Sequence, residues 1–207
     1  SGVVADSIVV DYDTSVCNTN DLAVKAYEVL RLNGYEPGQY DHVMYLIPYY
    51  GQCGWSGKGN VAGPTTWIKR FNLSIVLHEL GHNFGLYHAN AKECDTQVTN
   101  TTACSTVEYG DIYSVMGLSS QTFHLNAFHK EQLGWSENQV ITLTNSGTAT
   151  LAPTEENSTN PKTLKILKNI DINGNTEWYY IDYRQAIGFD ADLSLGWADQ
   201  LSGIRLY

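Results

Sequence analysis

Basic residues are scarce in this chain of 207 residues, which has 12 Lys plus Arg against 22 Asp plus Glu. No basic stripe runs along any segment, which argues against nucleic acid or an anionic membrane surface as a partner. No stretch of about 18 consecutive apolar residues occurs, so we expect no segment that crosses a membrane. The net charge of −10 is therefore interpreted as an aid to solubility.

Cysteine is limited to four residues, and none of their spacings matches a Cys-x-x-Cys metal or redox motif. An even count suits two disulfides. We favour Cys94–Cys104, which would close a short loop, with Cys17–Cys53 as the remaining pair. Four reduced, buried thiols are the alternative. Two disulfides would indicate an oxidising compartment, and the charged fraction of only 16 % agrees with a secreted, extracellular protein.

The most informative segment is His-Glu-Leu-Gly-His-Asn-Phe-Gly-Leu-Tyr-His, residues 78–88. Helical residues four apart share a face, so His78 and His82 can reach one ion together. Gly85 tolerates a positive φ, so a helix that ends near it would let the chain bend and return His88 to the metal. Three protein ligands plus one water are the pattern of a catalytic zinc site, whereas a structural zinc is held by four.

Glu79 follows the first of these ligands and faces the flank of the predicted metal site. From there it can hold a water molecule at the metal, accept its proton and pass that proton to the leaving amine. Peptide-bond hydrolysis by this route needs no nucleophilic side chain. Tyr87 and Tyr113 are conceivable helpers, although packing explains them more simply. The remaining histidines lack ligand spacing to one another and are interpreted as structural: His42, His124 and His129.

The N-terminal part of the chain predicts a strand–helix–strand unit with two parallel strands. Ser7–Asp11 reads as a buried strand, and His42–Pro48 reads as a second apolar strand. The helix between them is predicted to begin at a cap residue, Asn20 or Asp21, and to end before Gly34.

The histidine-bearing helix is predicted at Phe71–Phe84, with Asn72 as its N-cap. Before it, Gly51–Pro64 holds five glycines and is expected to be an irregular loop, followed by an edge strand at Thr65–Lys69. After it, residues 89–112 are polar and lack periodicity, so they are expected to form a long loop.

The C-terminal part of the chain changes to a strand-like pattern after one more helix, predicted at Gln121–Leu133. The Asn-Gly pair in Asp171–Asn175 is typical of a hairpin turn, which we favour over a calcium loop because the glycine stands at the wrong position. The strands predicted here are Val140–Leu151, Thr163–Leu167, Trp178–Tyr183 and Gly203–Tyr207.

The run 78–88 followed by Met116 resembles the metzincin clan of zinc endopeptidases, in which a methionine-containing turn lies beneath the metal. Further segments narrow the resemblance to the gametolysin (peptidase M11) family: His78–Ala89, Glu108–Asp111, Val115–Gly117 and His129–Trp135. Late segments are also similar to immune-inhibitor-A-like peptidases: Tyr179–Arg184 and Gly188–Asp190.

Two positions depart from the better-known metzincin branches. Leu118 stands where some members have a tyrosine that acts as a switchable zinc ligand, so no tyrosine ligand is expected from that position. Ala89 follows the third histidine and matches none of the residues that mark those branches, which favours a separate branch.

The resemblance implies an α/β (α+β) fold, namely a two-lobed metzincin-like metallopeptidase with a twisted mixed sheet, a zinc-binding helix and a β-rich C-terminal extension. It divides the chain into an N-terminal lobe (1–88), a C-terminal lobe with the Met-turn (89–135) and the β-rich extension (136–207). It implies that the stretch Gly59–Trp67 holds an edge strand that pairs with extended substrate. The N-terminal lobe would lack an early strand if Ser1 is a truncation point, and Gly203–Tyr207 reads as a strand cut at the chain end, which leaves open whether further domains follow.

The implied function is a secreted zinc endopeptidase that hydrolyses extracellular, matrix or cell-wall proteins, with zinc on His78, His82 and His88. Glu79 would be the general base and Met116 the structural floor of the site. We expect a monomer with a propeptide in its precursor and a protein or peptide substrate. Two alternatives stay open, a catalytically silent zinc-binding adhesion module and a metal-dependent hydrolase of non-peptide bonds.

Overall fold

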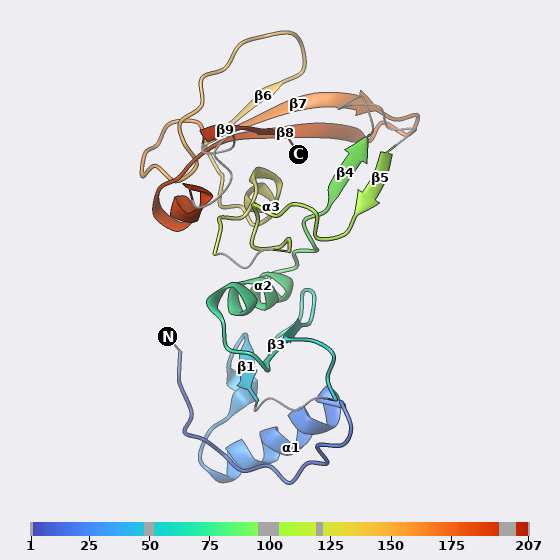
Figure 1. Ribbon diagram of the computed structural model, residues 1–207, viewed down its shortest axis with the longest axis vertical. Coiled ribbons are helices and arrows are strands. Elements are labelled where there is room, and N and C mark those ends of the chain that lie inside the picture. Colours follow the sequence, from blue (N-terminus) through green and yellow to red (C-terminus); the bar gives the residue numbers. More distant parts are fainter. Residues whose placement is uncertain (1, 48–51, 95–103, 119–121, 195–201, 207) are drawn as a thin grey trace. The chain divides into compact units, whose positions relative to one another are not determined.

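The computed structural model describes residues 2–47, 52–94, 104–118, 122–194 and 202–206. The chain divides into two compact units, Ser1–Tyr87 and His88–Tyr207, and each unit combines helices with small sheets (Figure 1). The predicted mixed α/β class is therefore confirmed, while the two-lobed metzincin arrangement stays a prediction. Within the described ranges, no helix has both the length and the hydropathy needed to span a bilayer.

The first unit is built around a three-stranded sheet with the order β1-β3-β2, in which β1 runs parallel and β2 antiparallel to β3. Helix α2 packs against β2 and β3. The elements of this unit are α1 (Thr19–Leu32), η1 (Pro37–Gln39), β1 (Val43–Leu46), β2 (Gly57–Gly59), β3 (Thr65–Ile68) and α2 (Leu73–Asn83).

The predicted strand at Ser7–Asp11 is wrong. No strand among the described residues pairs with it, and Val9 is 92 % exposed. The predicted parallel partner of β1 is therefore also wrong, because β3 takes that place. An apolar, β-branched run favours a strand only where a neighbouring strand and a core are available, and these are set by the fold rather than by the run itself.

The predicted edge strand at Thr65–Lys69 exists as β3, but it occupies the centre of the sheet. The two edges are formed by β1 and β2, and β2 lies inside the Gly51–Pro64 segment that is predicted to be an irregular loop. Glycine lowers strand propensity, so Gly-Lys-Gly gives no strand signal even though its backbone pairs regularly with β3. Parts of some predicted elements lie outside the described residues: Pro48, Gly51, 95–103, Gln121 and Tyr207.

Helix α1 begins two to three residues earlier than predicted, since the Asn18 side chain caps it by accepting a hydrogen bond from the Asp21 amide. It buries Leu22, Ala26 and Leu30, which are spaced four residues apart and therefore share one face of the helix. Gly34 ends it with φ 84°, the left-handed conformation that glycine adopts most readily.

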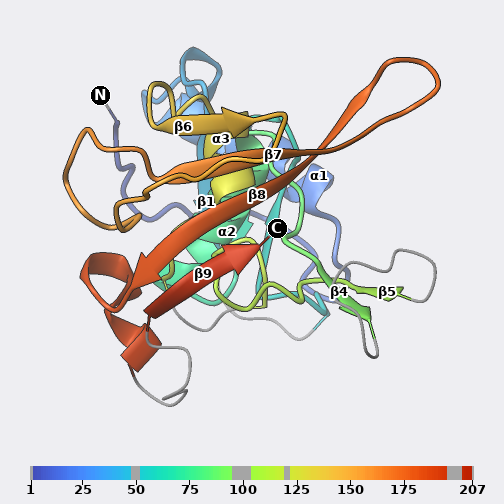
Figure 2. The ribbon, with the colours of Figure 1, turned by 90° about the horizontal axis from the view of Figure 1, so that it is seen from above.

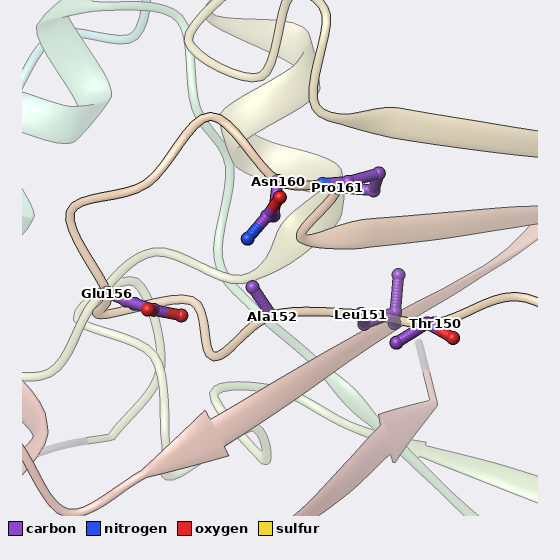
Figure 3. Close-up of a pocket in the computed structure, with 6 residues that line it drawn as sticks. All are labelled: Thr150, Leu151, Ala152, Glu156, Asn160 and Pro161. Carbon is purple, nitrogen blue, oxygen red and sulfur yellow. The ribbon is translucent and has the colours of Figure 1, made fainter.

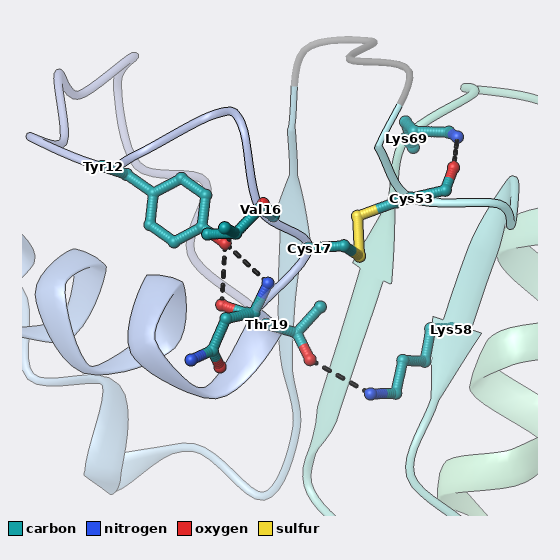
Figure 4. The surroundings of a disulfide bond; sticks show 8 residues. Tyr12, Val16, Cys17, Thr19, Cys53, Lys58 and Lys69 are labelled. Atoms are coloured by element: carbon teal, nitrogen blue, oxygen red, sulfur yellow. Dashed lines mark hydrogen bonds between the residues drawn. A yellow bond between two sulfur atoms is a disulfide. The ribbon is translucent and has the colours of Figure 1, made fainter.

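Two disulfides, Cys17–Cys53 and Cys94–Cys104, are present, so both favoured pairs are confirmed. Figure 4 shows Cys17 at the start of α1 and Cys53 on the segment before β2. Close to this bond, the Lys58 ammonium donates a hydrogen bond of 3.0 Å to the Thr19 hydroxyl. The disulfide and this hydrogen bond attach α1 to the edge of the sheet.

The second unit contains a two-stranded antiparallel sheet and a four-stranded sheet of order β6-β7-β8-β9 (Figure 2). Strands β6 and β7 are parallel, whereas β7–β8 and β8–β9 are antiparallel. The elements are β4 (Ala91–Cys94), β5 (Cys104–Val107), α3 (Ala127–Gln132), β6 (Val140–Leu143), β7 (Thr163–Ile170), β8 (Thr176–Gln185), η2 (Gly188–Ser194) and β9 (Ser202–Leu206).

The long loop predicted for residues 89–112 is wrong in part, because β4 and β5 pair within it. Cys94 and Cys104 face each other in this pairing, so the disulfide holds its register. The strands are polar and carry no apolar alternation that could have revealed them.

The helix predicted at Gln121–Leu133 is shorter than expected. Asn126 caps α3 by accepting a hydrogen bond from the His129 amide, and the described residues before it are not helical. The predicted strand Val140–Leu151 likewise ends at Leu143. The hairpin turn at Asp171–Asn175 is confirmed, with Gly174 at φ 85°.

Candidate metal centre

Helix α2 carries the first two candidate ligands on one face. Asn72 caps the helix as predicted, since its side chain accepts a hydrogen bond of 2.8 Å from the Ser74 amide. The rings of His78 and His82 lie edge to face with their centroids 4.8 Å apart. One turn of helix therefore aligns two imidazoles for a shared ion.

The turn that follows α2 depends on Gly85, which has φ 91°. The Gly85 amide donates to the His82 carbonyl and the Leu86 amide donates to the Gly81 carbonyl, so two carbonyls of the last turn are satisfied. Leu86 is fully buried, which anchors the chain directly after this bend. The predicted helix end at Gly85 is confirmed.

The three histidines of the motif come together. Nitrogen atoms of His78, His82 and His88 lie within 4.8 Å of one another. The Nδ1–H of His82 donates to the Leu86 carbonyl at 2.8 Å, and the Nδ1–H of His88 donates to the Glu108 carboxylate at 2.7 Å. A proton on Nδ1 places the ring's lone pair on Nε2, which is the form that binds a metal. This donor set fits a divalent transition metal such as zinc.

The position of His88 is set by the backbone of its neighbour Ala89. The Ala89 amide donates to the Met116 carbonyl at 2.8 Å, and the Ala89 carbonyl accepts from the Asp111 amide at 3.0 Å. The Tyr109 ring also lies against the His88 imidazole, with centroids 3.7 Å apart. The turn that contains Met116 therefore supports the segment that presents the third imidazole.

Replacing Glu108 by glutamine is expected to weaken metal binding about 10- to 100-fold, because the neutral amide holds the His88 tautomer less firmly. Competition against a chromophoric chelator measures this affinity. Glu93→Gln on the exposed face of β4 is the matched control and should leave the affinity unchanged. Equal affinities for the wild type and Glu108→Gln would contradict the assigned role.

Glu79 is buried, with 8 % of its surface exposed, although it is a carboxylate. Burial raises the pKa of Glu79 to about 7, and a hydrogen bond from the Gly59 backbone opposes that rise. A cation bound beside it would favour the charged form and lower this pKa. Burial and a bound cation would therefore act on the pKa of this carboxyl group in opposite directions.

The other residues named in the sequence analysis differ in their exposure and contacts. Met116 is fully buried, Leu118 is 76 % exposed and the Tyr87 side chain is 69 % exposed. The Tyr113 carbonyl accepts a hydrogen bond from Arg184. The remaining histidines pack against aromatic rings: His42 on Phe84, His124 on Phe189 and His129 on Phe128.

Two features of the site were not predicted from the sequence. Glu108 stands in one of the segments that carry the family resemblance, but it is 20 residues from His88 and nothing in its spacing assigns it a partner. The glycines of β2 lie against Glu79, and the sequence did not indicate this contact because Gly-Lys-Gly lacks the composition of a strand.

A separate hollow of about 390 Å³ lies in the second unit, in the chain between β6 and β7 (Figure 3). Its lining residues are Thr150, Leu151, Ala152, Glu156, Asn160 and Pro161. None of the three histidines, nor Glu79, belongs to this set, so the hollow is distinct from the candidate metal centre.

Three imidazoles beside a buried carboxylate are the arrangement of metal-dependent hydrolases. The sequence matches the family described as Gametolysin peptidase M11 over residues 13–202. The chain therefore belongs to the gametolysin peptidase family, which confirms the resemblance drawn from the motifs.

A curated relative, Autolysin of Chlamydomonas reinhardtii, is 26% identical over 106 residues. The matched part covers 45% of this chain and 15% of the relative, so the chain spans only a small part of that protein's length. No solved structure matches the chain at a significant level.

Proposed function

We propose that this chain is the catalytic unit of a secreted zinc endopeptidase that hydrolyses extracellular, matrix or cell-wall proteins. The observation that carries the proposal is the cluster of His78, His82 and His88 with the buried carboxylate of Glu79 next to its first member. Membership of the gametolysin peptidase family supports the peptide bond as the target. The two disulfides support an extracellular location.

The proposed division of labour assigns metal binding to the three histidines, with Nδ1 of His82 and of His88 held by their hydrogen bonds. Bound zinc would supply Lewis acidity to the scissile carbonyl and to the attacking water. Glu79 accepts the proton of that water and delivers it to the nitrogen of the leaving amine. Met116 stays a structural residue, since its buried side chain and its carbonyl support the chain around His88.

The proposed lobes follow the boundaries predicted from the sequence, 1–88, 89–135 and 136–207. In this arrangement β2, an edge strand of the first unit, replaces the central strand β3 as the candidate to pair with an extended substrate. The name of the relative, autolysin, agrees with a lytic enzyme.

Chelation of the metal is expected to abolish cleavage of casein or gelatin, and addition of zinc should restore it. Addition of calcium alone to the chelated protein is the control, and it should not restore cleavage, because imidazole ligands select zinc over calcium. Fluorescence-quenched peptides measure the rate. Cleavage that survives chelation would contradict the proposal.

Two outcomes of the same assay would favour the alternatives. Zinc binding without cleavage of any protein would favour the silent adhesion module. Chelator-sensitive hydrolysis confined to ester or glycoside substrates would favour a hydrolase of non-peptide bonds.

A further inference from the structure

We propose that Gly57 of β2 is a positioning residue for Glu79, because its lack of a side chain leaves the space that the Glu79 carboxylate occupies. This inference rests on the proposed function, since the orientation of the carboxylate matters for catalysis only if Glu79 accepts the proton of the attacking water. It concerns the contact between an edge strand and the metal-binding helix within the first unit.

Gly57 and Gly59 lie two residues apart on β2, so they share one face of the strand. That face meets α2. A Cβ atom added at Gly57 would stand 2.6 Å from Glu79 Cγ and 2.8 Å from Glu79 Oε1. Carbon atoms pack at about 3.5–4.0 Å, so the glutamate side chain must move if this position gains a methyl group.

Lys58, between the two glycines, faces the other way. Its ammonium donates to the Thr19 hydroxyl and lies 5.4 Å from the centre of the Trp67 ring. The alternation Gly-Lys-Gly therefore leaves only backbone on the side of Glu79 and places the long side chain on the opposite side.

The helix is held too firmly to withdraw from β2. The buried Asn83 side chain accepts a hydrogen bond from the Thr66 hydroxyl and donates to the carbonyls of Asn60 and Thr65. The Ala62 amide donates to the His82 carbonyl at 2.8 Å. These bonds attach the C-terminal turn of α2 to the sheet and to the segment after β2. A collision at Gly57 must therefore be relieved by movement of the side chains that it meets, which are those of Glu79 and Ile75.

The two glycines lie against different parts of α2. A Cβ at Gly59 would stand 2.3 Å from the Glu79 backbone carbonyl oxygen, so Gly59 is required for the packing of the strand on the helix. Its amide also donates a hydrogen bond to the Glu79 carboxylate. The three atoms nearest to a Cβ at Gly57 all belong to side chains, namely Cγ and Oε1 of Glu79 and the Cγ2 methyl of Ile75. Substitution at Gly57 is therefore the informative test, because its nearest contacts are with side chains, the Glu79 carboxylate among them, and not with the helix backbone.

The test is Gly57→Ala. We expect kcat for a quenched peptide to fall about 100-fold with KM changed less than about twofold, since displacement of a catalytic group by about 1 Å has an effect of this size. Zinc content and the thermal midpoint should stay close to those of the wild type. The matched control is Gly54→Ala, where an added Cβ meets no atom within 4 Å, and its kcat should equal that of the wild type.

A second variant separates the two side-chain contacts. Gly57→Ala combined with Ile75→Ala removes the collision with Ile75 and retains the collision with Glu79, so kcat should stay low relative to Ile75→Ala alone. Recovery of kcat in the double variant would overturn the proposal, because the obstacle would then be Ile75.

A spectroscopic measurement tests the same contact without reference to activity. In chelated protein labelled with ¹³C at the glutamate carboxyl carbon, the Glu79 resonance is the one missing from Glu79→Gln. It should shift in Gly57→Ala and stay in place in Gly54→Ala. An unshifted resonance together with an unchanged kcat would overturn the positioning role and leave the proposed function standing. Absence of chelator-sensitive cleavage in the wild type would remove the proposed function, while the resonance would still report on the contact.

Discussion

Replacing Glu79 by glutamine is expected to lower the rate of peptide-bond cleavage by about 10²- to 10⁴-fold, the usual contribution of general acid–base catalysis. Glutamine keeps the length and shape of the side chain but cannot accept the proton of the attacking water. His78, His82 and His88 are unchanged, so zinc content should stay at the wild-type level. Steady-state kinetics on a quenched peptide and metal analysis of the same sample measure both quantities.

The control for this variant is Glu28→Gln, which makes the same chemical change on the exposed face of α1. It should leave both the cleavage rate and the zinc content unaltered. A Glu79→Gln variant that retains zinc and cleaves at the wild-type rate would contradict the proposed mechanism. Loss of zinc from Glu79→Gln would instead show that the carboxylate contributes to metal binding.

Replacing Arg184 by methionine is expected to reduce the free energy of unfolding by about 3–5 kcal/mol, because it leaves buried carboxyl groups without their positive partner. Arg184 is 1 % exposed, and its Nε donates to Asp190 and to Glu155 at 3.2 Å. Its Nη2 also donates to the Tyr113 carbonyl at 3.2 Å.

The opposite pKa shifts of the two carboxyl groups indicate which of them carries the negative charge. Burial, assisted by a hydrogen bond shared with Asp190, raises the pKa of Glu155 to about 7. Burial would also raise the pKa of Asp190, but its hydrogen bonds with Glu155 and Arg184 outweigh that effect and lower it. Asp190 is thus the main counter-charge of Arg184. Methionine matches the volume of the arginine stem but leaves this buried anion uncompensated.

Urea unfolding followed by fluorescence measures the effect, with Arg31→Met as the matched control. Arg31 pairs with Glu36 at 3.3 Å, but both side chains are about half exposed, at 58% and 46%. An exposed ion pair contributes about 0–1 kcal/mol, so the control should be nearly neutral. Equal losses of stability in the two variants would contradict the importance assigned to burial.

The candidate site was largely predictable because its main determinants are local. Spacing alone places His78 and His82 on one helix face, Asn72 at the helix start and Gly85 at the bend. Each of these depends on residues within about one turn, where backbone geometry leaves few options. The partner of His88 was not predictable, since Glu108 reaches it through a hairpin whose pairing depends on the fold.

The sheets were less predictable because strand pairing depends on residues far apart in the sequence. Ser7–Asp11 has the composition of a strand and is exposed, whereas the Gly-Lys-Gly of β2 lacks that composition and pairs with β3. Strand formation depends on the partner that the rest of the chain supplies, so composition alone misplaced both segments. The β7–β8 hairpin was predicted correctly, because its turn residues are specific by themselves.

The three histidines lie close together in the sequence, and this affects the order in which parts of the protein fold. Residues 78–88 form one run, so only short loops need to close to bring these imidazoles together, and short loops close quickly. The hydrogen bond from Arg184 to the Tyr113 carbonyl joins residues 71 apart in the sequence. Because synthesis delivers the N-terminal part first, the metal-binding segment is expected to take shape before the strand that carries Arg184 has left the ribosome.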